Sequence, residues 1–316
     1  MSGSPSSRSS SAHRAVGFVD KGGTGKTTTL AHLGVVFENE LDYETVLIDL
    51  AGKQGDLAKH FGVWEQVEVA VANDDDWPNI ATTFQEKWGQ VARLQDESTG
   101  DPLADMILSL DEGPDLIPTS EELDGIDSML NTVDDPGERY ARLDAFLTEY
   151  VDERYDVILI DAAGSSSNIT MNALRAAGHV VALSKPAPFD EGQARKLRTD
   201  LKSMVEQQTL ETDLTMVMLN ELDGNTIAGR EFLQRFEAEF GPAMAPQQIP
   251  STQDIINAQM RGTTLFELED PLATAERAMD AYRANATELA RRFETCDWMT
   301  ETDSSTVESD ISTEVN

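Results

Sequence analysis

The segment from Val19 to Leu33, VDKGGTGKTTTLAHL, carries the residue types that a phosphate-binding loop needs. Glycines let backbone N–H groups curl around anionic oxygens, a lysine contacts the β- and γ-phosphates, and a hydroxyl binds Mg²⁺ at the positive start of a helix. We expect Gly22, Gly23 and Gly25 to form the backbone cradle. Lys26 is then the phosphate lysine, and Thr27 supplies the hydroxyl that binds the metal. The segment therefore predicts a nucleoside triphosphate site.

The strict pattern G-x-x-x-x-G-K-[ST] is not met, because Asp20 stands where the first glycine belongs and a further lysine, Lys21, precedes the glycines. The surroundings are nevertheless those that the motif requires. An apolar run over 15–19 predicts a buried strand, and the pattern from residue 26 to about 40 predicts a helix. The missing glycine therefore does not remove the chemistry.

Further apolar runs and helical patterns alternate along the chain. Strands are expected over 45–50, 114–120, 156–161, 179–186 and 213–220, and helices over 137–155, 166–178, 190–207, 228–241 and 271–294. This alternation predicts an α/β fold, a doubly wound and mostly parallel sheet with helices on both faces. We expect one domain over 15–295 with a variable helical and loop region at 64–113, a disordered tail over 1–14, and a disordered acidic tail over 296–316.

Acidic residues dominate the composition. The 316 residues include 58 Asp and Glu against 24 Lys and Arg, a net charge of −34. Because molar salt shortens the Debye length to about 3 Å, this excess favours a salt-adapted surface over an acidic interaction protein. One cysteine, Cys296, excludes a disulfide framework within the chain, and the four histidines lack metal-ligand spacing. With no apolar run of membrane-spanning length, we expect a cytoplasmic protein.

The loop KGGTGKTT resembles the deviant Walker A loop of the ParA/MinD family of partition and positioning ATPases, in its Soj-like partition branch. In that family the residue before the signature lysine varies, so Asp20 is no defect. The resemblance implies that Lys21 reaches the phosphates of a second protomer, and hence an ATP-dependent homodimer. It also implies nucleotide contacts along the loop, at Lys21, Gly22, Gly23, Thr24, Gly25, Lys26, Thr27 and Thr28.

The resemblance continues beyond the loop. The segment YDVILIDAAGSSSNITMNALRAAG is similar to the family's Walker B region, which implies that Asp161 holds Mg²⁺ through water. VMLN ends in Asn220, at a family position near adenine, and QQIPSTQDIINAQMRGTTLFE places Pro250 where the family packs on the base. The implied cofactors are ATP and Mg²⁺.

The second strand departs from the family pattern D-x-D-P-Q, because it reads LIDLAGKQGDLAKHFG. Asp49 matches the first aspartate, which organises the metal and its waters, but the water-positioning aspartate falls on Ala51. Two interpretations stay open. Either hydrolysis is slow, with Gln54 or Asp56 orienting water, or it is lost and the protein is an ATP-binding switch.

The resemblance implies plasmid or chromosome partitioning, or intracellular positioning, with a ParB-like adaptor and nonspecific DNA as candidate partners. The candidate DNA contacts are Arg230, Arg235 and Arg261, but the helix that carries the first two also carries glutamates. Nucleoid association therefore rests on the resemblance alone. The acidic C-terminal stretch lacks the basic amphipathic helix of a MinD-type membrane anchor. A metabolic P-loop enzyme is the weaker alternative, because no substrate-site motif is visible.

Overall fold

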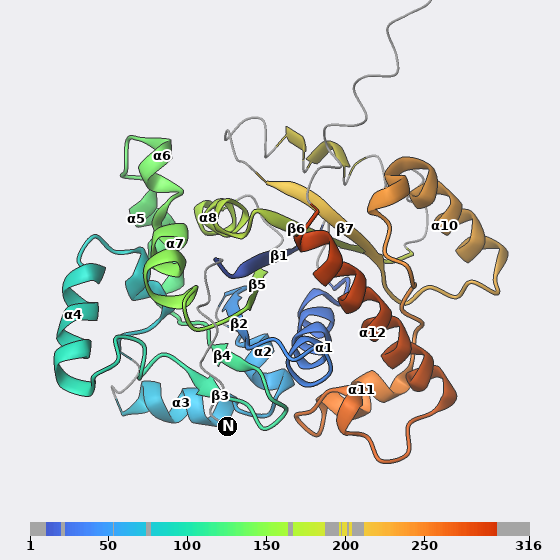
Figure 1. Ribbon diagram of the computed structural model, residues 1–316, viewed down its shortest axis with the longest axis horizontal. Coiled ribbons are helices and arrows are strands. Elements are labelled where there is room, and N and C mark those ends of the chain that lie inside the picture. Colours follow the sequence, from blue (N-terminus) through green and yellow to red (C-terminus); the bar gives the residue numbers. More distant parts are fainter. Residues whose placement is uncertain are drawn as a thin grey trace, which may run out of the picture.

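A seven-stranded sheet organises the described part of the computed structural model, which comprises residues 11–19, 23–52, 54–73, 77–163, 167–186, 196, 198–200, 202–203 and 212–295. The strand order is β3-β4-β2-β5-β1-β6-β7 (Figure 1). The strands are β1 His13–Val19, β2 Thr45–Leu50, β3 Leu108–Ser109, β4 Asp115–Ile117, β5 Val157–Ala162, β6 His179–Ser184 and β7 Asp213–Leu219. All neighbouring strands run parallel except β3 and β4, so the predicted mostly parallel sheet is confirmed.

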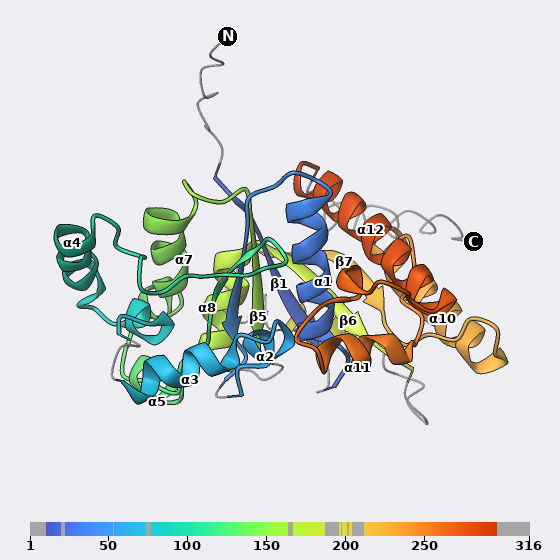
Figure 2. The ribbon, with the colours of Figure 1, turned by 90° about the horizontal axis from the view of Figure 1, so that it is seen from below.

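Helices cover both faces of this sheet (Figures 1 and 2). Alternate strand residues point to opposite sides, so Val46 and Ile48 join one apolar core while Leu47 joins the other. One core includes α1 Lys26–Asn39, α2 Asp56–His60, α3 Trp64–Ala72, η4 Leu265–Glu267, α11 Gln253–Gln259 and α12 Ala273–Phe293. On the other side lie η1 Ile80–Phe84, α4 Trp88–Thr99, α5 Leu123–Leu130, α6 Pro136–Arg139, α7 Arg142–Phe146, η2 Leu147–Val151, α8 Asn168–Ala177, α10 Ile227–Phe240 and η3 Gly241–Ala243.

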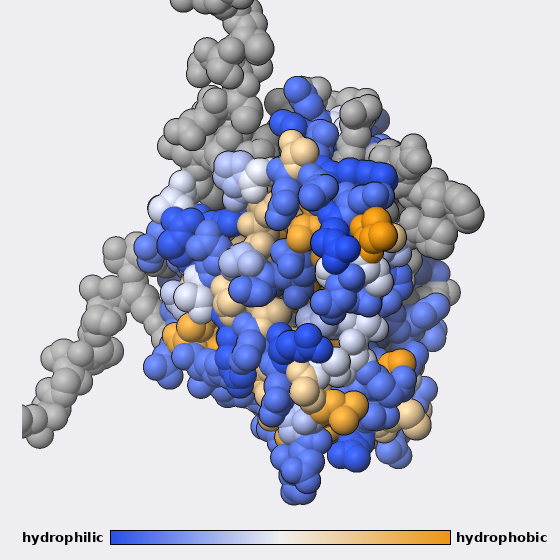
Figure 3. All heavy atoms as spheres, turned by 90° about the vertical axis from the view of Figure 1, so that its right-hand side faces the viewer, coloured by the Kyte–Doolittle hydropathy of each residue, from blue (hydrophilic) through white to orange (hydrophobic). Residues whose placement is uncertain are grey.

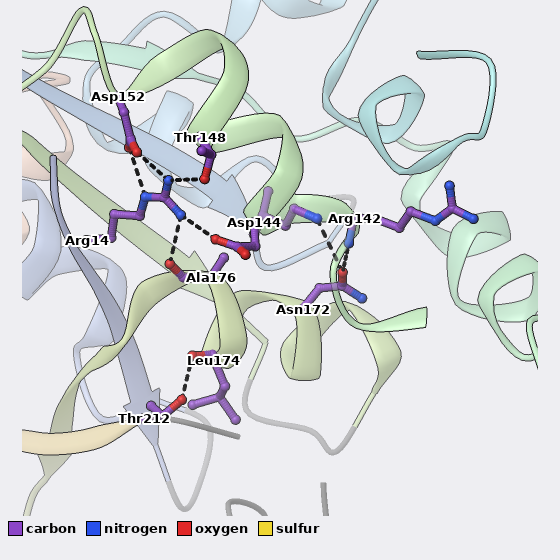
Figure 4. A network of polar contacts seen from close by, with 10 residues as sticks. Arg14, Arg142, Asp144, Thr148, Asp152, Asn172, Leu174, Ala176 and Thr212 are labelled. Carbon is purple, nitrogen blue, oxygen red and sulfur yellow. Dashed lines mark hydrogen bonds and ion pairs between the residues drawn. The ribbon is translucent and has the colours of Figure 1, made fainter. Parts of the chain in front are cut away.

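Three sequence expectations differ from the structure. The first strand begins at His13 rather than residue 15, and β3 was not expected, since two residues are too few to show a period. The helix expected over 137–155 is divided into α6, α7 and a π-helical turn. A tertiary contact accompanies this division, because the Asn172 side-chain oxygen accepts the N–H groups of Arg142 and Leu143 at 3.0 and 3.3 Å (Figure 4). The helix expected over 190–207 lies mostly outside the described residues.

A buried arginine joins the start of β1 to α7, η2 and α8 (Figure 4). Arg14 is 8 % exposed and donates to both carboxylate oxygens of Asp152, at 2.9 and 2.5 Å. It also donates to Asp144 at 2.7 Å, to the Thr148 hydroxyl at 2.8 Å and to the Ala176 carbonyl at 3.2 Å. The guanidinium is thus satisfied at each of its three nitrogens, as a buried charge requires.

The surface over α10 to α12 is mainly hydrophilic, with apolar side chains that lie apart from one another (Figure 3). Exposed apolar residues in this part of the chain are Ile227, Ile256, Met260 and Leu272. No helix in the described ranges is both long and apolar enough to cross a membrane.

Candidate functional site

A hollow of about 550 Å³ opens where residues that follow three neighbouring strands meet. Residues 23–28, after β1, form one wall. Ala51, Asp56, Lys59 and His60 follow β2, and Ala163 follows β5. Ligands in doubly wound sheets bind at such carboxyl ends of parallel strands. The structure therefore brings together the loop and the two strand ends that the sequence indicated separately.

The loop is held from behind by Asn220, at the end of β7. Its side-chain amide donates to the Thr24 carbonyl at 2.8 Å and to the Thr29 hydroxyl at 2.9 Å, and the residue is 4 % exposed. Gly25 has a φ of 83°, and a Cβ there would come within 2.9 Å of the Asn220 nitrogen. Both the backbone angle and this close approach therefore require glycine at position 25.

Asn220 and Pro250, the two residues predicted to contact the adenine base, are not among the residues that line the hollow. The Asn220 amide faces the loop, as just described. Pro250 follows Ile249, whose N–H donates to the Leu219 carbonyl at 2.9 Å, and it is not among the lining residues. The contact of either residue with adenine stays a prediction. Lys21 and Gly22 lie outside the described residues.

Lys26 and Thr27, the first residues of α1, both contact Asp161. The Lys26 ammonium forms an ion pair with one carboxylate oxygen, and the Thr27 hydroxyl donates to the other at 2.6 Å. Asp49 is the register partner of Asp161 on β2. Both aspartates are fully buried, and Asp49 accepts the N–H groups of Ala51 at 2.9 Å and Leu57 at 3.4 Å. Two buried carboxylates thus lie together directly behind Lys26 and Thr27, the two residues of this group that line the hollow.

Burial shifts the pKa values of Lys26 and Asp49. It lowers the pKa of Lys26 to about 8, although Asp49 and Asp56 oppose the shift. It raises the pKa of Asp49 to about 6, against its two backbone hydrogen bonds and Lys26. The charged forms of Lys26 and Asp49 are therefore less stable here than in water. A bound anion would stabilise the charged form of Lys26, and a bound cation would stabilise that of Asp49.

The oxygen donors fit Mg²⁺. Within the described ranges no cluster of three or more His, Cys, Asp or Glu side chains is arranged to hold a metal by itself. Mg²⁺ is usually bound by one or two carboxylates together with waters and substrate phosphates. Thr27, Asp49 and Asp161 match this incomplete donor set, which suits a metal that arrives with a phosphate ligand.

Three lining residues were missed by sequence reasoning: Lys59, His60 and Gln259. The Gln259 side-chain nitrogen donates to the Thr28 hydroxyl at 2.9 Å and lies 3.2 Å from His60 Nδ1. Behind them, His32 Nδ1 donates to the Thr28 carbonyl at 2.7 Å, because its Nε2 accepts the Leu265 N–H at 3.1 Å. No spacing rule joins positions so far apart in the chain, so only the fold reveals this group.

Two buried histidines, His32 and His60, and the partly buried His179 predict a loss of stability in acid. Burial lowers the pKa of His32 to about 3 and that of His60 and His179 to about 4, below the ordinary 6.5. Between pH 6.5 and 4 the unfolded chain therefore binds protons that the folded chain does not. Each histidine then lowers the free energy of unfolding by up to about 1.4 kcal/mol per pH unit as pH falls. Asp49, with its pKa raised to about 6, works in the opposite direction.

His60→Gln tests this expectation, because a glutamine oxygen can still accept from Gln259. Denaturant unfolding at pH 7, 6 and 5 in molar KCl should show a shallower fall of the unfolding free energy in the variant than in the wild type. Equal slopes would contradict a neutral, buried His60.

Comparisons with known proteins agree with this geometry. The chain is 28% identical to the chromosome-partitioning ATPase Soj of Thermus thermophilus over 275 residues, which cover 87% of this chain and 94% of Soj. Among solved structures, an ATP complex of a McdA variant from Cyanothece has a TM-score of 0.68 at 18% identity, with 88% and 97% of the two chains covered. Cobyrinic acid a,c-diamide synthase from Mycobacterium smegmatis, with ADP and magnesium bound, has a TM-score of 0.64 at 23% identity and covers 89% and 96%. At these identities the two structures show the shared fold alone.

A family model described as an AAA domain matches residues 16–216. The match includes the phosphate loop, both buried aspartates and four of the six parallel strands in full, with most of β1 and the start of β7. Because it extends over more than half of the chain, the protein belongs to the AAA domain family.

Proposed function

We propose that this protein binds ATP with Mg²⁺ and acts as a ParA-type ATPase in plasmid or chromosome partitioning or in intracellular positioning. One observation carries the proposal: Lys26 and Thr27, which line a hollow together with the glycine loop, both contact the buried Asp161. The similarity to Soj supports the biological role.

Each residue has a physical task in this proposal. The loop's backbone N–H groups and Lys26 contact the phosphates, and Lys26 exchanges its pairing with Asp161 for phosphate oxygens. Thr27, Asp49 and Asp161 hold Mg²⁺, directly or through water. Bound Mg²⁺ neutralises negative charge on the β- and γ-phosphates. The hollow and the helix start of α1 orient the triphosphate along the loop.

Hydrolysis needs a group that orients water, and Ala51 has none. Asp56, at the start of α2, is the carboxylate that lines the hollow beside Ala51, whereas Gln54 is not part of the lining. We therefore propose slow hydrolysis with Asp56 in the orienting role. A non-hydrolysing ATP-dependent switch is the second candidate, because Ala51 cannot position water.

Turnover in molar KCl with Mg²⁺ separates these candidates. Restoring the carboxylate with Ala51→Asp should raise the rate by about 100-fold, since such groups contribute roughly 10²–10⁴. Asp56→Asn should lower the slow wild-type rate at least tenfold, and Lys26→Ala should abolish it. ATP binding with no wild-type turnover, and turnover in Ala51→Asp, would instead establish the switch. Wild-type turnover that neither Lys26→Ala nor Asp56→Asn changes would contradict the proposed site.

We also propose that the protein forms an ATP-dependent homodimer in which Lys21 contacts the phosphates bound by the partner. It is further proposed to be salt-adapted and cytoplasmic, and to act with a ParB-like adaptor.

DNA binding has weaker support. On α10, Arg235 forms an ion pair with Glu231 at 3.9 Å, and Arg230 donates to the Asn225 carbonyl at 2.9 Å. Arg261 follows α11, a different helix, so these candidates do not share one basic stripe (Figure 1).

A further inference from the structure

Lysine is rare in this chain, and two of the described lysines line the hollow. Only eight of the 316 residues are lysines, and four of these, Lys21, Lys26, Lys53 and Lys59, fall on the segments that follow β1 and β2. Lys26 and Lys59 both line the hollow. In a chain with a net charge of −34 and few lysines, two lysines in the lining of one hollow indicate that an anion binds there.

The two described lysines are held differently. Lys26 is mostly buried and paired with Asp161. Lys59 is exposed on α2, and its ammonium lies 4.9 Å from the centre of the Trp64 ring. Within the described residues no carboxylate forms an ion pair with Lys59, although the chain has 58 acidic residues. A cation–π contact at an exposed position stabilises by only about 0.5–1 kcal/mol, so Lys59 can leave the ring at little cost.

The negative charges around the hollow favour a second cation, Lys59, beside Lys26. Asp49, Asp56 and Asp161 already place carboxylates beside Lys26. The γ-phosphate adds further negative charge that ADP does not have. A lysine with a flexible four-carbon stem on α2, next to the loop that contains Ala51, can extend into the hollow to meet that charge.

We propose that Lys59 contacts the terminal phosphate of ATP and gives the site its preference for ATP over ADP, leaving the Trp64 ring when it does so. The inference rests on the proposed ATP site and adds a residue that the family pattern does not supply.

Trp64 makes the movement observable. Gly55, with a φ of 59°, lies so close to the indole that a Cβ there would come within 1.9 Å of it. The ring thus lies against the loop between β2 and α2, and Lys59 lies over it. Trp64 also borders a mainly apolar cavity of about 280 Å³, together with Val67 and Val71 of α3. Withdrawal of the ammonium therefore changes the surroundings of the indole and its fluorescence.

The test measures calorimetric affinities of the full chain for AMPPNP and ADP in molar KCl with Mg²⁺. Lys59→Met keeps an apolar stem on Trp64 but removes the charge. It should weaken AMPPNP binding about tenfold, the loss expected for one charge-assisted contact, and should change ADP binding less than twofold. Lys59→Arg should keep most of the AMPPNP preference. Lys87→Met, an exposed lysine just before α4, is the matched control and should bind both nucleotides as the wild type does.

Trp64 emission, taken as the difference between each protein and its Trp64→Phe version, supplies the second readout. AMPPNP should change this emission in the wild type and not in Lys59→Met, and ADP should change it in neither. If Lys59→Met binds both nucleotides like the wild type, or weakens both equally, the inference is wrong while the ATP site stands. If the wild type binds neither nucleotide, the proposed function and the inference both fail.

Discussion

Replacing Lys26 with alanine is expected to weaken ATP binding by about 100-fold, the loss of one strong charge-assisted contact. The same change should lower the free energy of unfolding by roughly 3–5 kcal/mol, because it leaves a buried charge unpaired. The reason is the position of Asp161, which is fully buried and has Lys26 as its counter-ion. Calorimetric titration with ATP and denaturant unfolding, both in molar KCl, measure the two effects.

A double variant separates the two effects. In Lys26→Ala with Asp161→Asn the buried charge is gone, so most of the lost stability should return while ATP affinity stays low. Lys87→Ala, at an exposed position before α4, should change neither quantity. If the stability of Lys26→Ala equals that of the wild type, the buried ion pair contributes nothing to the fold. If its ATP affinity also stays unchanged, Lys26 does not contact phosphate.

Replacing Arg14 with methionine is expected to lower the free energy of unfolding by roughly 3–5 kcal/mol, the cost of breaking a buried pair by removing one partner. Most of the loss comes from Asp152, whose side chain is 8% exposed and which accepts two of the guanidinium bonds. Asp144 is 43% exposed, so water screens its pairing and it contributes less. Denaturant unfolding in molar KCl measures the change.

The control variants test whether geometry or charge matters. Arg14→Lys keeps the positive charge but loses the planar guanidinium group. Its free energy of unfolding should therefore lie between those of the wild type and Arg14→Met. Arg230→Met, on the exposed face of α10, should change stability by less than about 0.5 kcal/mol. ATP affinity of folded Arg14→Met should equal that of the wild type, because Arg14 lies near the start of β1 and the phosphate loop follows its end. A stability loss below about 1 kcal/mol would contradict the assigned role of the network.

The sequence predicted the parts of the fold that repeat a local pattern. Apolar runs such as TVLIDL and the residues before Asp161 are buried on both faces, so β2 and β5 could be recognised without tertiary information. Features that depend on contacts between residues far apart in the chain could not be predicted in this way. Asn172 contacts the backbone at the start of α7 from thirty residues away, and Arg14 finds Asp152 across 138 positions.

The candidate site likewise combines residues that a local motif predicts with residues that only the fold brings together. The loop and Asp161 follow a local motif, and the structure brings Lys26 and Thr27 onto that aspartate. Gln259 reaches Thr28 from 231 positions further along the chain, and Lys59 enters the hollow only because α2 folds beside the loop. The scarcity of lysine is visible in the sequence, but only the fold shows that Lys26, after β1, and Lys59, after β2, line the same hollow.

The most direct measurement is a calorimetric titration of ATP into the full chain in molar KCl, with Mg²⁺ and with EDTA, beside the Lys26→Ala variant. We expect saturable binding of one ATP per chain that weakens without Mg²⁺ and weakens by about 100-fold in Lys26→Ala. Folded wild-type protein that binds no ATP, or a Lys26→Ala variant that binds ATP with the wild-type affinity, would contradict the assignment of this hollow as the nucleotide site.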